Sequence, residues 1–509
     1  MNLGTKSHHA KYLNDTGRGK LLGCFAMTET GHGSNVRALE TTAIYDHDQK
    51  TIIINSPSET AGKEYIGNAL HGRMAAVFAQ LIVDGKNHGI HSILVPYRDS
   101  EGNLLDGIRV EDCGYKLGLN GVDNGRIWFD NVRVPKENLL NRFGDIDEDG
   151  KYHSSIENPA KRFFTMLGTL VGGRVSVALG ALSASKKALH VAIKYGLKRR
   201  QFGPALGAEE TILLDYPSHQ RRLLPNLAKA YALDFALSKL KKLYMEQANG
   251  DMRDVETLAA GLKAYTTWFN TQNIQECREA CGGKGYLMEN AFADLKADTD
   301  VFSTFEGDNV VLMQLVAKGL LSEFKENFNE EGFFGVMRFL ASRFGTSIVE
   351  KNPFNIRRTD TSHLLDYAFQ LEAFQYRKEQ LLYSVVQRMR SYLRRQINAY
   401  DAYLKCQIHM LKLASAYTEL IVLESFQEGI EKVEEQHLKT YLIRMRNLFA
   451  LNALEEDKGW FLENDYFEGA KSKAIRRVVN KLCQEVRVDA DCYVDAFAIP
   501  PELINAQIV

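Results

Sequence analysis

The chain has 509 residues, enough for three or four domains of ordinary size, and 45% of them are apolar, so a substantial core is available. Its 63 Lys and Arg residues nearly balance its 64 Asp and Glu residues, whereas a nucleic-acid binder usually carries a strong basic excess. No apolar run approaches the roughly 20 residues of a membrane span. We therefore expect neither a nucleic-acid partner nor a membrane span.

The seven cysteines are an odd number and are scattered along the chain. This usage fits a reducing compartment better than a disulfide scaffold. Cys277 and Cys281 lie one helical turn apart, but neither a second pair nor a nearby histidine completes a zinc site. We expect both to be buried thiols, and we predict no metal site.

Residues 20 to about 135 contain short strand candidates separated by polar turns. The candidates are 21–28, 38–46, 51–54, 75–83, 91–96 and 125–134. Short strands at this spacing predict a barrel-like or sandwich-like domain.

From about residue 160, apolar residues recur with a period of 3.6, which predicts a long helix ending near Gly196. The residues of its apolar face are Leu167, Val171, Val175, Leu179 and Leu182. Further helices are predicted at 217–248, 254–281 and 308–322. Pro225 should kink or interrupt the first of these three, and four helices with short connections predict an up-and-down bundle.

A polar segment from Lys325 to Gly332 has the composition of a linker. Beyond it, helices are predicted at 364–427, 431–454 and 470–486. The predicted fold class is therefore α+β: a central β-barrel-like or sandwich-like domain, a four-helix bundle, and a second, C-terminal all-α domain.

The segment from Asp300 to Asn309 places one carboxylate, Glu306, between an aromatic ring and a glycine, just ahead of an apolar helix. Asp308 or Asn309 can cap that helix, and Gly307 allows a sharp turn. A carboxylate flanked by apolar groups has a raised proton affinity, which suits a general base near neutral pH. Alone, such a glutamate is more often a solvated loop carboxylate, but a second motif argues against that interpretation.

The second motif runs from Gly23 to Val36, where a predicted buried strand leads into a glycine-rich polar loop. Together with the Glu306 segment, it resembles the acyl-CoA oxidases, within the wider acyl-CoA dehydrogenase superfamily, and the resemblance runs from about Leu3 to Leu321. Further matching stretches are Tyr65–Ala69, Leu119–Gly125, Arg199–Gly203 and Ala280–Tyr286.

The resemblance implies an FAD-dependent acyl-CoA oxidase of fatty-acid β-oxidation. Such an enzyme desaturates an acyl-CoA to the trans-2-enoyl-CoA and reduces molecular oxygen to hydrogen peroxide. The resemblance assigns removal of the α-proton to Glu306. Two alternatives stay open. One is an acyl-CoA dehydrogenase that uses electron-transfer flavoprotein, against which the extra C-terminal helices argue. The other is an inactive, flavin-free fragment or scaffold.

No Gly-x-Gly-x-x-Gly or Walker-type signature occurs in a strand-turn-helix context, which argues against a Rossmann-bound nicotinamide. The resemblance instead implies flavin contacts from the β domain and from helix ends. The implied cofactor-binding residues are Met27, Thr28, Tyr65, Ile66, Gly67, Arg200, Gln201, Phe202, Gly282, Gly283 and Asp308. The implied substrate-binding residues are Ser34 and Arg174. Many dehydrogenases have Thr or Ser at the Gly67 position, and the lost hydroxyl leaves space that favours oxygen access.

Plainer interpretations of these residues stay open beside the implied ones. Tyr65 to Gly67 can be an ordinary strand end, and Gly282 with Gly283 can be a helix-terminating turn. Arg200 can offset a helix dipole, and Arg174 can belong to an ion pair on a helix surface.

Relatives in this family carry an N-terminal helical domain, whereas Met1 precedes residues that resemble the last turn of that domain. We therefore expect a fragment, a mis-started reading frame, or a chain with a separately encoded N-terminal domain. The predicted domains are 1–19 as a remnant of that region, 20–150 as the β domain, 151–325 as the bundle, and 326–509 as the C-terminal helical domain.

Family flavin sites straddle two subunits, which implies a homodimer. The segment from Asn505 to Val509 lacks a Ser-Lys-Leu address, so we expect a bacterial cytoplasmic protein rather than a peroxisomal one.

Overall fold

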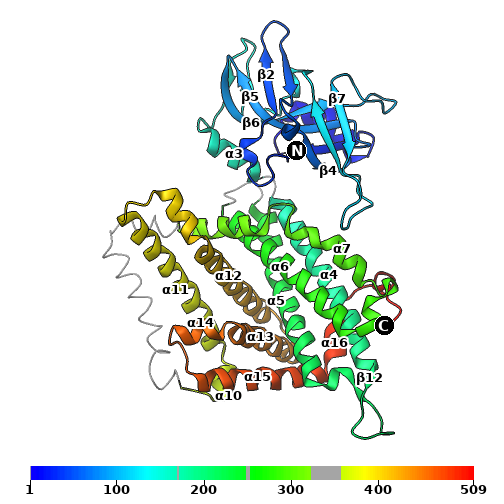
Figure 1. Cartoon of the computed structure of the whole chain (residues 1–509), viewed down its shortest axis with the longest axis vertical. Coiled ribbons are helices and arrows are strands. Elements are labelled where there is room, and N and C mark those ends of the chain that lie inside the picture. Colours follow the sequence, from blue (N-terminus) through cyan, green and yellow to red (C-terminus); the bar gives the residue numbers. More distant parts are fainter. Residues whose placement is uncertain (1, 169–170, 248–252, 322–356) are drawn as a thin grey trace. The chain divides into compact units, whose positions relative to one another are not determined.

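The structure is a computed structural model, which describes residues 2–168, 171–247, 253–321 and 357–509 (Figure 1). It divides into two compact units, Met1–Val171 and Gly172–Val509. The first unit contains all the larger sheets, and the second is almost entirely helical. A mixed α+β fold with separate β and helical parts was predicted, and this prediction is confirmed.

The first unit contains a six-stranded sheet in the order β1-β5-β2-β3-β9, with β6 also paired to β5. Its strands are β1 Gly23–Ala26, β2 Thr42–Asp46, β3 Thr51–Asn55, β5 Met74–Val83, β6 Lys86–Pro96 and β9 Val132–Pro135. Strands β1 and β2 run parallel to β5, and the other pairs are antiparallel. Asp84 and Gly85 connect β5 to β6 with positive φ at both positions, as a two-residue hairpin turn requires.

A second sheet of three strands has the order β4-β8-β7. Its strands are β4 Lys63–Ile66, β7 Ile108–Asp112 and β8 Gly125–Phe129. Buried and less buried residues alternate along β2, β3 and β8, so each strand turns one face inward. Side chains from both sheets, such as Ile54, Val77 and Ile127, form one apolar core. A core shared by two sheets is what the predicted sandwich-like domain requires.

Smaller elements complete the first unit. They are α1 Lys6–His8, a π-helical turn His9–Leu13, α2 Asn14–Gly17, β10 Asp145–Ile146, β11 Tyr152–His153 and α3 Pro159–Leu167. Phe163 and Met166 of α3 pack with Phe78 and Ile90 of the large sheet.

The second unit begins with long helices that correspond to the predicted bundle. They are α4 Val171–Lys198, α5 Pro217–Gln247, α6 Arg253–Ala280 and a helix that is described over residues 309–321. A short hairpin of β12 Arg200–Gln201 and β13 Thr211–Ile212 lies between α4 and α5, and α7 Phe292–Asp300 precedes the last helix. Helix α5 continues through Pro225, so the break that this proline could have marked is not present.

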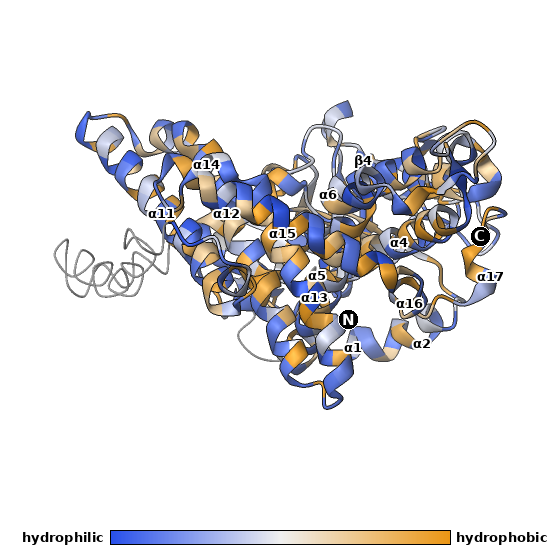
Figure 2. Cartoon of the chain, turned by 90° about the horizontal axis from the view of Figure 1, so that it is seen from below, coloured by the Kyte–Doolittle hydropathy of each residue, from blue (hydrophilic) through white to orange (hydrophobic). Residues whose placement is uncertain are grey.

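The remaining helices of the second unit are α10 Thr361–Leu364, α11 Tyr367–Arg394, α12 Ala399–Glu431, α13 Gln436–Glu456, α14 Lys458–Glu463, α15 Gly469–Val488, α16 Ala490–Asp495 and α17 Pro501–Ile504. Among them, α12, α13 and α15 pack on α5, and α11 packs mainly on α12. In α15 the buried residues recur at spacings of three and four, and Figure 2 shows its hydrophilic and hydrophobic colours side by side. The predicted linker at 325–332 lies outside the described residues.

The predicted helix at 364–427 is wrong in one respect, because it is two helices. Helix α11 ends at Arg394, and Asn398 caps α12 by accepting a hydrogen bond from the Asp401 N–H at 2.9 Å. Cys277 and Cys281 are buried free thiols, which confirms their predicted state. Within the described part of the chain, no helix combines the length and apolar character needed to cross a membrane.

Candidate active site

Glu306 lies in a sharp turn between α7 and the helix over 309–321. Both Glu306 and Gly307 have positive φ, of 54° and 103°. A non-glycine residue in this region costs about 1–3 kcal/mol, and such residues cluster at functional sites. Asp308 then caps the helix, because its Oδ1 accepts hydrogen bonds from the N–H groups of Val310 at 2.9 Å and Val311 at 3.2 Å. Of the two caps that the sequence allows, the structure therefore uses Asp308.

The Glu306 carboxylate lies directly over Gly173, in the first turn of α4. A Cβ atom at position 173 would lie 2.7 Å from Cδ and from both carboxylate oxygens of Glu306. Glu306 as a whole is exposed, but the partial burial of its carboxylate against α4 raises the pKa of Glu306, against the opposing charges of Arg174 and Lys263. The raised pKa moves the carboxyl group toward the range that suits a general base near neutral pH.

Arg174 also lies in the first turn of α4. Its Nε donates a long hydrogen bond of 3.4 Å to the backbone oxygen of Glu306. Burial lowers the pKa of Arg174, and the charges of Glu256 and Glu306 oppose that effect. The structure therefore brings Arg174, Glu306 and Asp308 together. The role of Arg174 in substrate binding stays a prediction.

The sequence analysis did not identify Lys263, which is fully buried on α6 beneath the same turn. Its Nζ donates to the Gly307 oxygen at 2.7 Å and to Asn309 Oδ1 at 3.1 Å. Burial lowers its pKa to about 8. The signal in the sequence was a lysine between the apolar residues Ala260, Leu262 and Ala264, all of which are buried. Lysine is almost never fully buried without partners.

In the first unit, the loop after β1 meets the start of β4. The Glu64 N–H donates to the Thr28 oxygen at 2.9 Å, which brings two sequence motifs together. Met27 is buried, Thr28 is half-buried and Ser34 is exposed.

Tyr65 and Gly67 lie at the end of β4, as the plainer interpretation of this stretch expected. Tyr65 has a φ of 61° and is 65% exposed, and its oxygen accepts a hydrogen bond from Asn124 Nδ2 at 2.9 Å. Ile66 is buried, and a Cβ at position 67 would have Val122 as its nearest neighbour, at 3.7 Å. The exposed ring and the open space at Gly67 leave room for a ligand.

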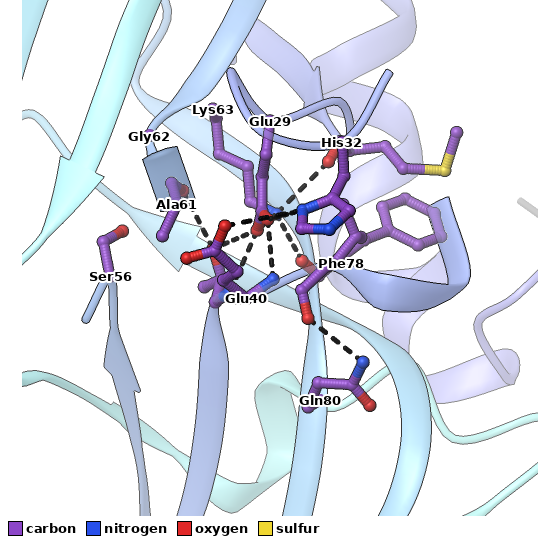
Figure 3. A network of polar contacts seen from close by, with 12 residues as sticks. Glu29, His32, Glu40, Ser56, Ala61, Gly62, Lys63, Phe78 and Gln80 are labelled. Carbon is purple, nitrogen blue, oxygen red and sulfur yellow. Dashed lines mark hydrogen bonds and ion pairs between the residues drawn. The ribbon is translucent and has the colours of Figure 1, made fainter. Parts of the chain in front are cut away.

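A buried ion pair anchors this loop, and the sequence analysis did not identify it (Figure 3). Glu29 and Lys63 are both fully buried, with Nζ 2.9 Å from Oε1. Lys63 also donates to the backbone oxygens of Met27 at 3.2 Å and Phe78 at 2.6 Å. Burial lowers the pKa of Lys63 to about 8. The pair fixes the backbone beside Met27 and Thr28.

Glu29, His32 and Glu40 have side-chain atoms close enough to share a cation. However, Glu29 Oε1 already accepts from Lys63 and from the Thr41 hydroxyl at 2.6 Å, and Oε2 accepts from the Glu40 N–H at 2.6 Å (Figure 3). We therefore interpret the group as part of the structural network around the loop.

The segment that contains Arg200 forms the β12–β13 hairpin beyond the end of α4. Arg200 Nη1 donates to the Glu210 oxygen at 2.7 Å and pairs with Glu209 Oε1 at 2.9 Å. The Tyr216 hydroxyl donates to the Gln201 oxygen at 2.7 Å, and Phe202 is 78% exposed with a φ of 56°.

Arg200 and Glu306 do not lie together within one chain. Glu306 contacts the first turn of α4, whereas Arg200 follows its last residue, and 28 helical residues span about 40 Å. Gly282 and Gly283 follow α6, and Gly282 has a φ of 56°, as a helix-terminating turn requires. Apart from their adjoining residues, no described residue would have a heavy atom within 4 Å of a Cβ at either glycine, so their backbone is open to a ligand.

Family models match most of the chain. An acyl-CoA dehydrogenase middle domain matches residues 24–132, an acyl-CoA oxidase C-alpha1 domain matches 167–321, and an acyl-CoA oxidase model matches 366–508. Peroxisomal acyl-coenzyme A oxidase 2 of Arabidopsis thaliana is 41% identical over the whole chain, which covers 75% of that protein. An acyl-coenzyme A oxidase-like protein of Mus musculus is 39% identical over 99% of the chain and 80% of its own length.

Solved structures give the same result. An acyl-CoA oxidase of Yarrowia lipolytica matches with a TM-score of 0.89 and 33% identity, over 99% of this chain and 74% of that one. An acyl-CoA oxidase of Caenorhabditis elegans, bound with FAD, ascaroside-CoA and ATP, matches with a TM-score of 0.87 and 27% identity, over 99% of this chain and 75% of that one.

The relatives correct one expectation from the sequence. They come from eukaryotes, and those of Arabidopsis thaliana and Homo sapiens are named as peroxisomal. The expected bacterial cytoplasmic location is therefore wrong. That expectation depended on five terminal residues, and a missing Ser-Lys-Leu tripeptide is not evidence for a compartment. Three family models in chain order, the identities over the full chain and the shared fold lead to one conclusion: the chain belongs to the acyl-CoA oxidase family.

Proposed function

We propose that the chain is an FAD-dependent acyl-CoA oxidase of fatty-acid β-oxidation. It desaturates an acyl-CoA to the trans-2-enoyl-CoA, and the two electrons reduce molecular oxygen to hydrogen peroxide. The observation that supports this most strongly is Glu306, a carboxylate with a raised pKa in a turn of positive φ, in a chain of this family.

Glu306 is the base in this proposal. The α-proton of a thioester is weakly acidic, so a carboxylate must be held against it in a fixed position. The positive φ of Glu306, the close approach of Gly173 and the cap at Asp308 fix that position. Because only the ionised carboxylate accepts the proton, activity should fall as the pH falls through the raised pKa of Glu306.

Bound FAD supplies the acceptor for the two electrons and their passage to oxygen. Among the residues that we assign to FAD in the first unit, Tyr65 has an exposed ring and Gly67 has open space beside it. Among those in the second unit, Arg200 is exposed and the backbone of Gly282 is open. An exposed cation and an open glycine backbone suit a pyrophosphate, so these residues fit the cofactor. The full set stays as the sequence implied it, with Ser34 and Arg174 assigned to the substrate.

A homodimer is part of the proposal. Arg200 lies about 40 Å of helix from Glu306, so a flavin beside Glu306 would need Arg200 from a second copy. Phe202, Tyr286 and Met288 are large apolar residues that expose 78%, 80% and 62% of their surfaces. Exposed apolar groups of this kind commonly mark protein contacts.

The test is to purify the chain, record its flavin spectrum, and add a saturated acyl-CoA in air without another electron acceptor. We expect one hydrogen peroxide for each enoyl-CoA formed. Turnover only with electron-transfer flavoprotein would instead favour the dehydrogenase, and a colourless, inactive protein would favour the scaffold.

A further inference from the structure

We propose that Lys263 is a positioning residue for Glu306: its ammonium group holds the Glu306–Gly307 turn in place, and its charge stabilises the ionised carboxylate. This inference depends on the proposed role of Glu306 as the base. The hydrogen bonds of Lys263 go to Gly307 and Asn309 rather than to the Glu306 carboxylate, so it acts through the turn and through its charge.

The contacts of Lys263 define the first part of this role. Its Nζ donates to the Gly307 oxygen at 2.7 Å and to Asn309 Oδ1 at 3.1 Å, from a side chain that is completely buried. Hydrogen bonds from a charged donor are stronger than neutral ones. The Gly307 oxygen belongs to the peptide unit that follows Gly307, so this bond opposes any change in the backbone of the turn.

The second acceptor of Lys263 is itself fixed. Asn309 Nδ2 donates to Thr267 Oγ1 at 2.9 Å and to the Ala264 oxygen at 3.2 Å. These two bonds orient the amide so that its oxygen faces Lys263. The start of the helix over 309–321 is thereby fixed to α6, and Glu306 lies three residues before that helix.

The charges around Lys263 define the second part of the role. Within the described ranges, no carboxylate oxygen lies within 4.0 Å of its Nζ, and both of its hydrogen-bond acceptors are neutral. The charged groups that face it are Asp308 and Glu306 from the turn and Arg174 from α4. A buried charge without an ion-pair partner has a longer effective range than an exposed one, so it favours the ionised form of Glu306.

Two limbs of the pH–rate profile follow from these charges. Lys263 lowers the pKa of Glu306, which burial raises, so the lysine broadens the acid side of the active range. Burial also lowers the pKa of Lys263 itself to about 8. Above that pH the ammonium loses its charge, and the alkaline limb of the profile should begin there.

The experiment compares Lys263→Met with Lys263→Gln in the full chain loaded with flavin. Met removes both the charge and the donor, whereas Gln keeps a donor without the charge. Lys239→Met is the matched control, because Lys239 is a half-buried lysine of α5 that pairs with Glu428 at 2.7 Å. The measurements are the pH profile of kcat/KM, the flavin content, and an infrared titration of the Glu306 carboxyl group against the Glu306→Gln variant.

We expect Lys263→Met to lower kcat about 10- to 100-fold, the cost of a misplaced catalytic group. Its acid limb and its carboxyl titration should move up by about one pH unit, the effect of losing a nearby opposite charge. Lys263→Gln should show the same shift with a smaller loss of rate. The flavin content of both variants, and every measurement on Lys239→Met, should match the parent.

An unchanged acid limb and carboxyl titration in a folded variant would overturn the proposal. So would a Lys263→Gln variant that does not fold, because Lys263 would then support the fold rather than Glu306. The infrared titration needs no turnover, so it can succeed or fail separately from the proposed activity. If Glu306→Gln stays active while the carboxyl titration shifts, Lys263 acts on Glu306 but the assigned base is wrong.

Discussion

Glu306 and Gly173 lie 133 positions apart in the chain, yet the carboxylate of one occupies the space that a side chain would take at the other. The sequence predicted the turn, its glycine and the helix cap, because these depend on neighbouring residues. It did not predict Gly173, Lys263 or the Glu29–Lys63 pair, because these depend on which elements pack together. A charged residue on a buried helix face or strand was the only local signal for the two lysines.

Gly173→Ala should lower kcat about 100-fold, because its Cβ would lie 2.7 Å from the Glu306 carboxylate and displace it. Flavin content should not change. Gly180→Ala on the same helix is the matched control, because its Cβ would meet Phe302 at an ordinary distance of 3.5 Å. Steady-state kinetics of the two variants checks this prediction, and equal rates would show that the close approach to Gly173 does not position the carboxylate.

Long helices with a clear apolar period were predicted within a few residues, as α5 and α6 show. Strand β7 was missed, and β4 was foreseen only in part, as the open alternative of a strand end at Tyr65 to Gly67. Strand β4 buries Lys63 and Glu64, which interrupts its apolar pattern. In β7, Ile108 and Val110 do alternate with polar residues, but the strand has only five residues and none of them is fully buried, so its signal is short. The break between α11 and α12 was missed, because the sequence between Arg395 and Asn398 contains neither glycine nor proline to mark the turn.

Strand β6 contains a second feature that depends on packing, the buried His91. Its Nδ1 is 3.0 Å from the Gly89 oxygen, so it donates there, and Nε2 accepts from the Tyr152 hydroxyl at 2.9 Å. Burial lowers the pKa of His91 from 6.5 to about 4, so the ring is neutral near pH 7 and Nε2 is the acceptor. The unfolded chain binds a proton at a higher pH than the folded chain does. Stability is therefore present above pH 6.5 and is lost as the pH falls toward 4.

The first unit should lose up to about 3 kcal/mol of stability through His91 between pH 6.5 and 4. His91→Gln should flatten this part of the pH dependence, even if it lowers stability overall. His47→Gln should not flatten it, because His47 lies at the surface and pairs with Asp84 at 2.7 Å. Hydrogen exchange of β5 and β6 amides, corrected for intrinsic rates, measures the slope. A slope that survives in His91→Gln would contradict the assignment.

At the scale of the whole molecule, the order of a β part followed by helices was predictable from the change of apolar period alone. The finer bounds at 19, 150 and 325 stay predictions, because the structure gives two units that divide after Val171. The C-terminal helices pack on α5 and are joined to α6 through polar groups: Arg377 pairs with Glu419, which accepts from the Tyr265 hydroxyl at 3.1 Å. Such contacts between distant segments cannot be seen in an apolar pattern.

The flavin assignments span residues from both units, and they came from resemblance rather than from local chemistry. Periodicity and composition alone would have left Gly67 as a strand end, Arg200 as a cation that offsets a helix dipole, and Gly282 as a helix end. The structure keeps these positions open or exposed, which is what a bound cofactor would need. The central claim, however, concerns one carboxylate and the proton that it removes.

Glu306→Gln tests that claim most directly. Flavin-loaded parent and variant are mixed with a saturated acyl-CoA without oxygen, and bleaching of the flavin absorbance is followed in time. Gln has nearly the same size, so fold, flavin content and acyl-CoA binding should survive, but it cannot accept the α-proton. Bleaching should slow by roughly 10²- to 10⁴-fold. If the variant bleaches as fast as a parent that reacts, Glu306 is not the base, and the account of this site is wrong.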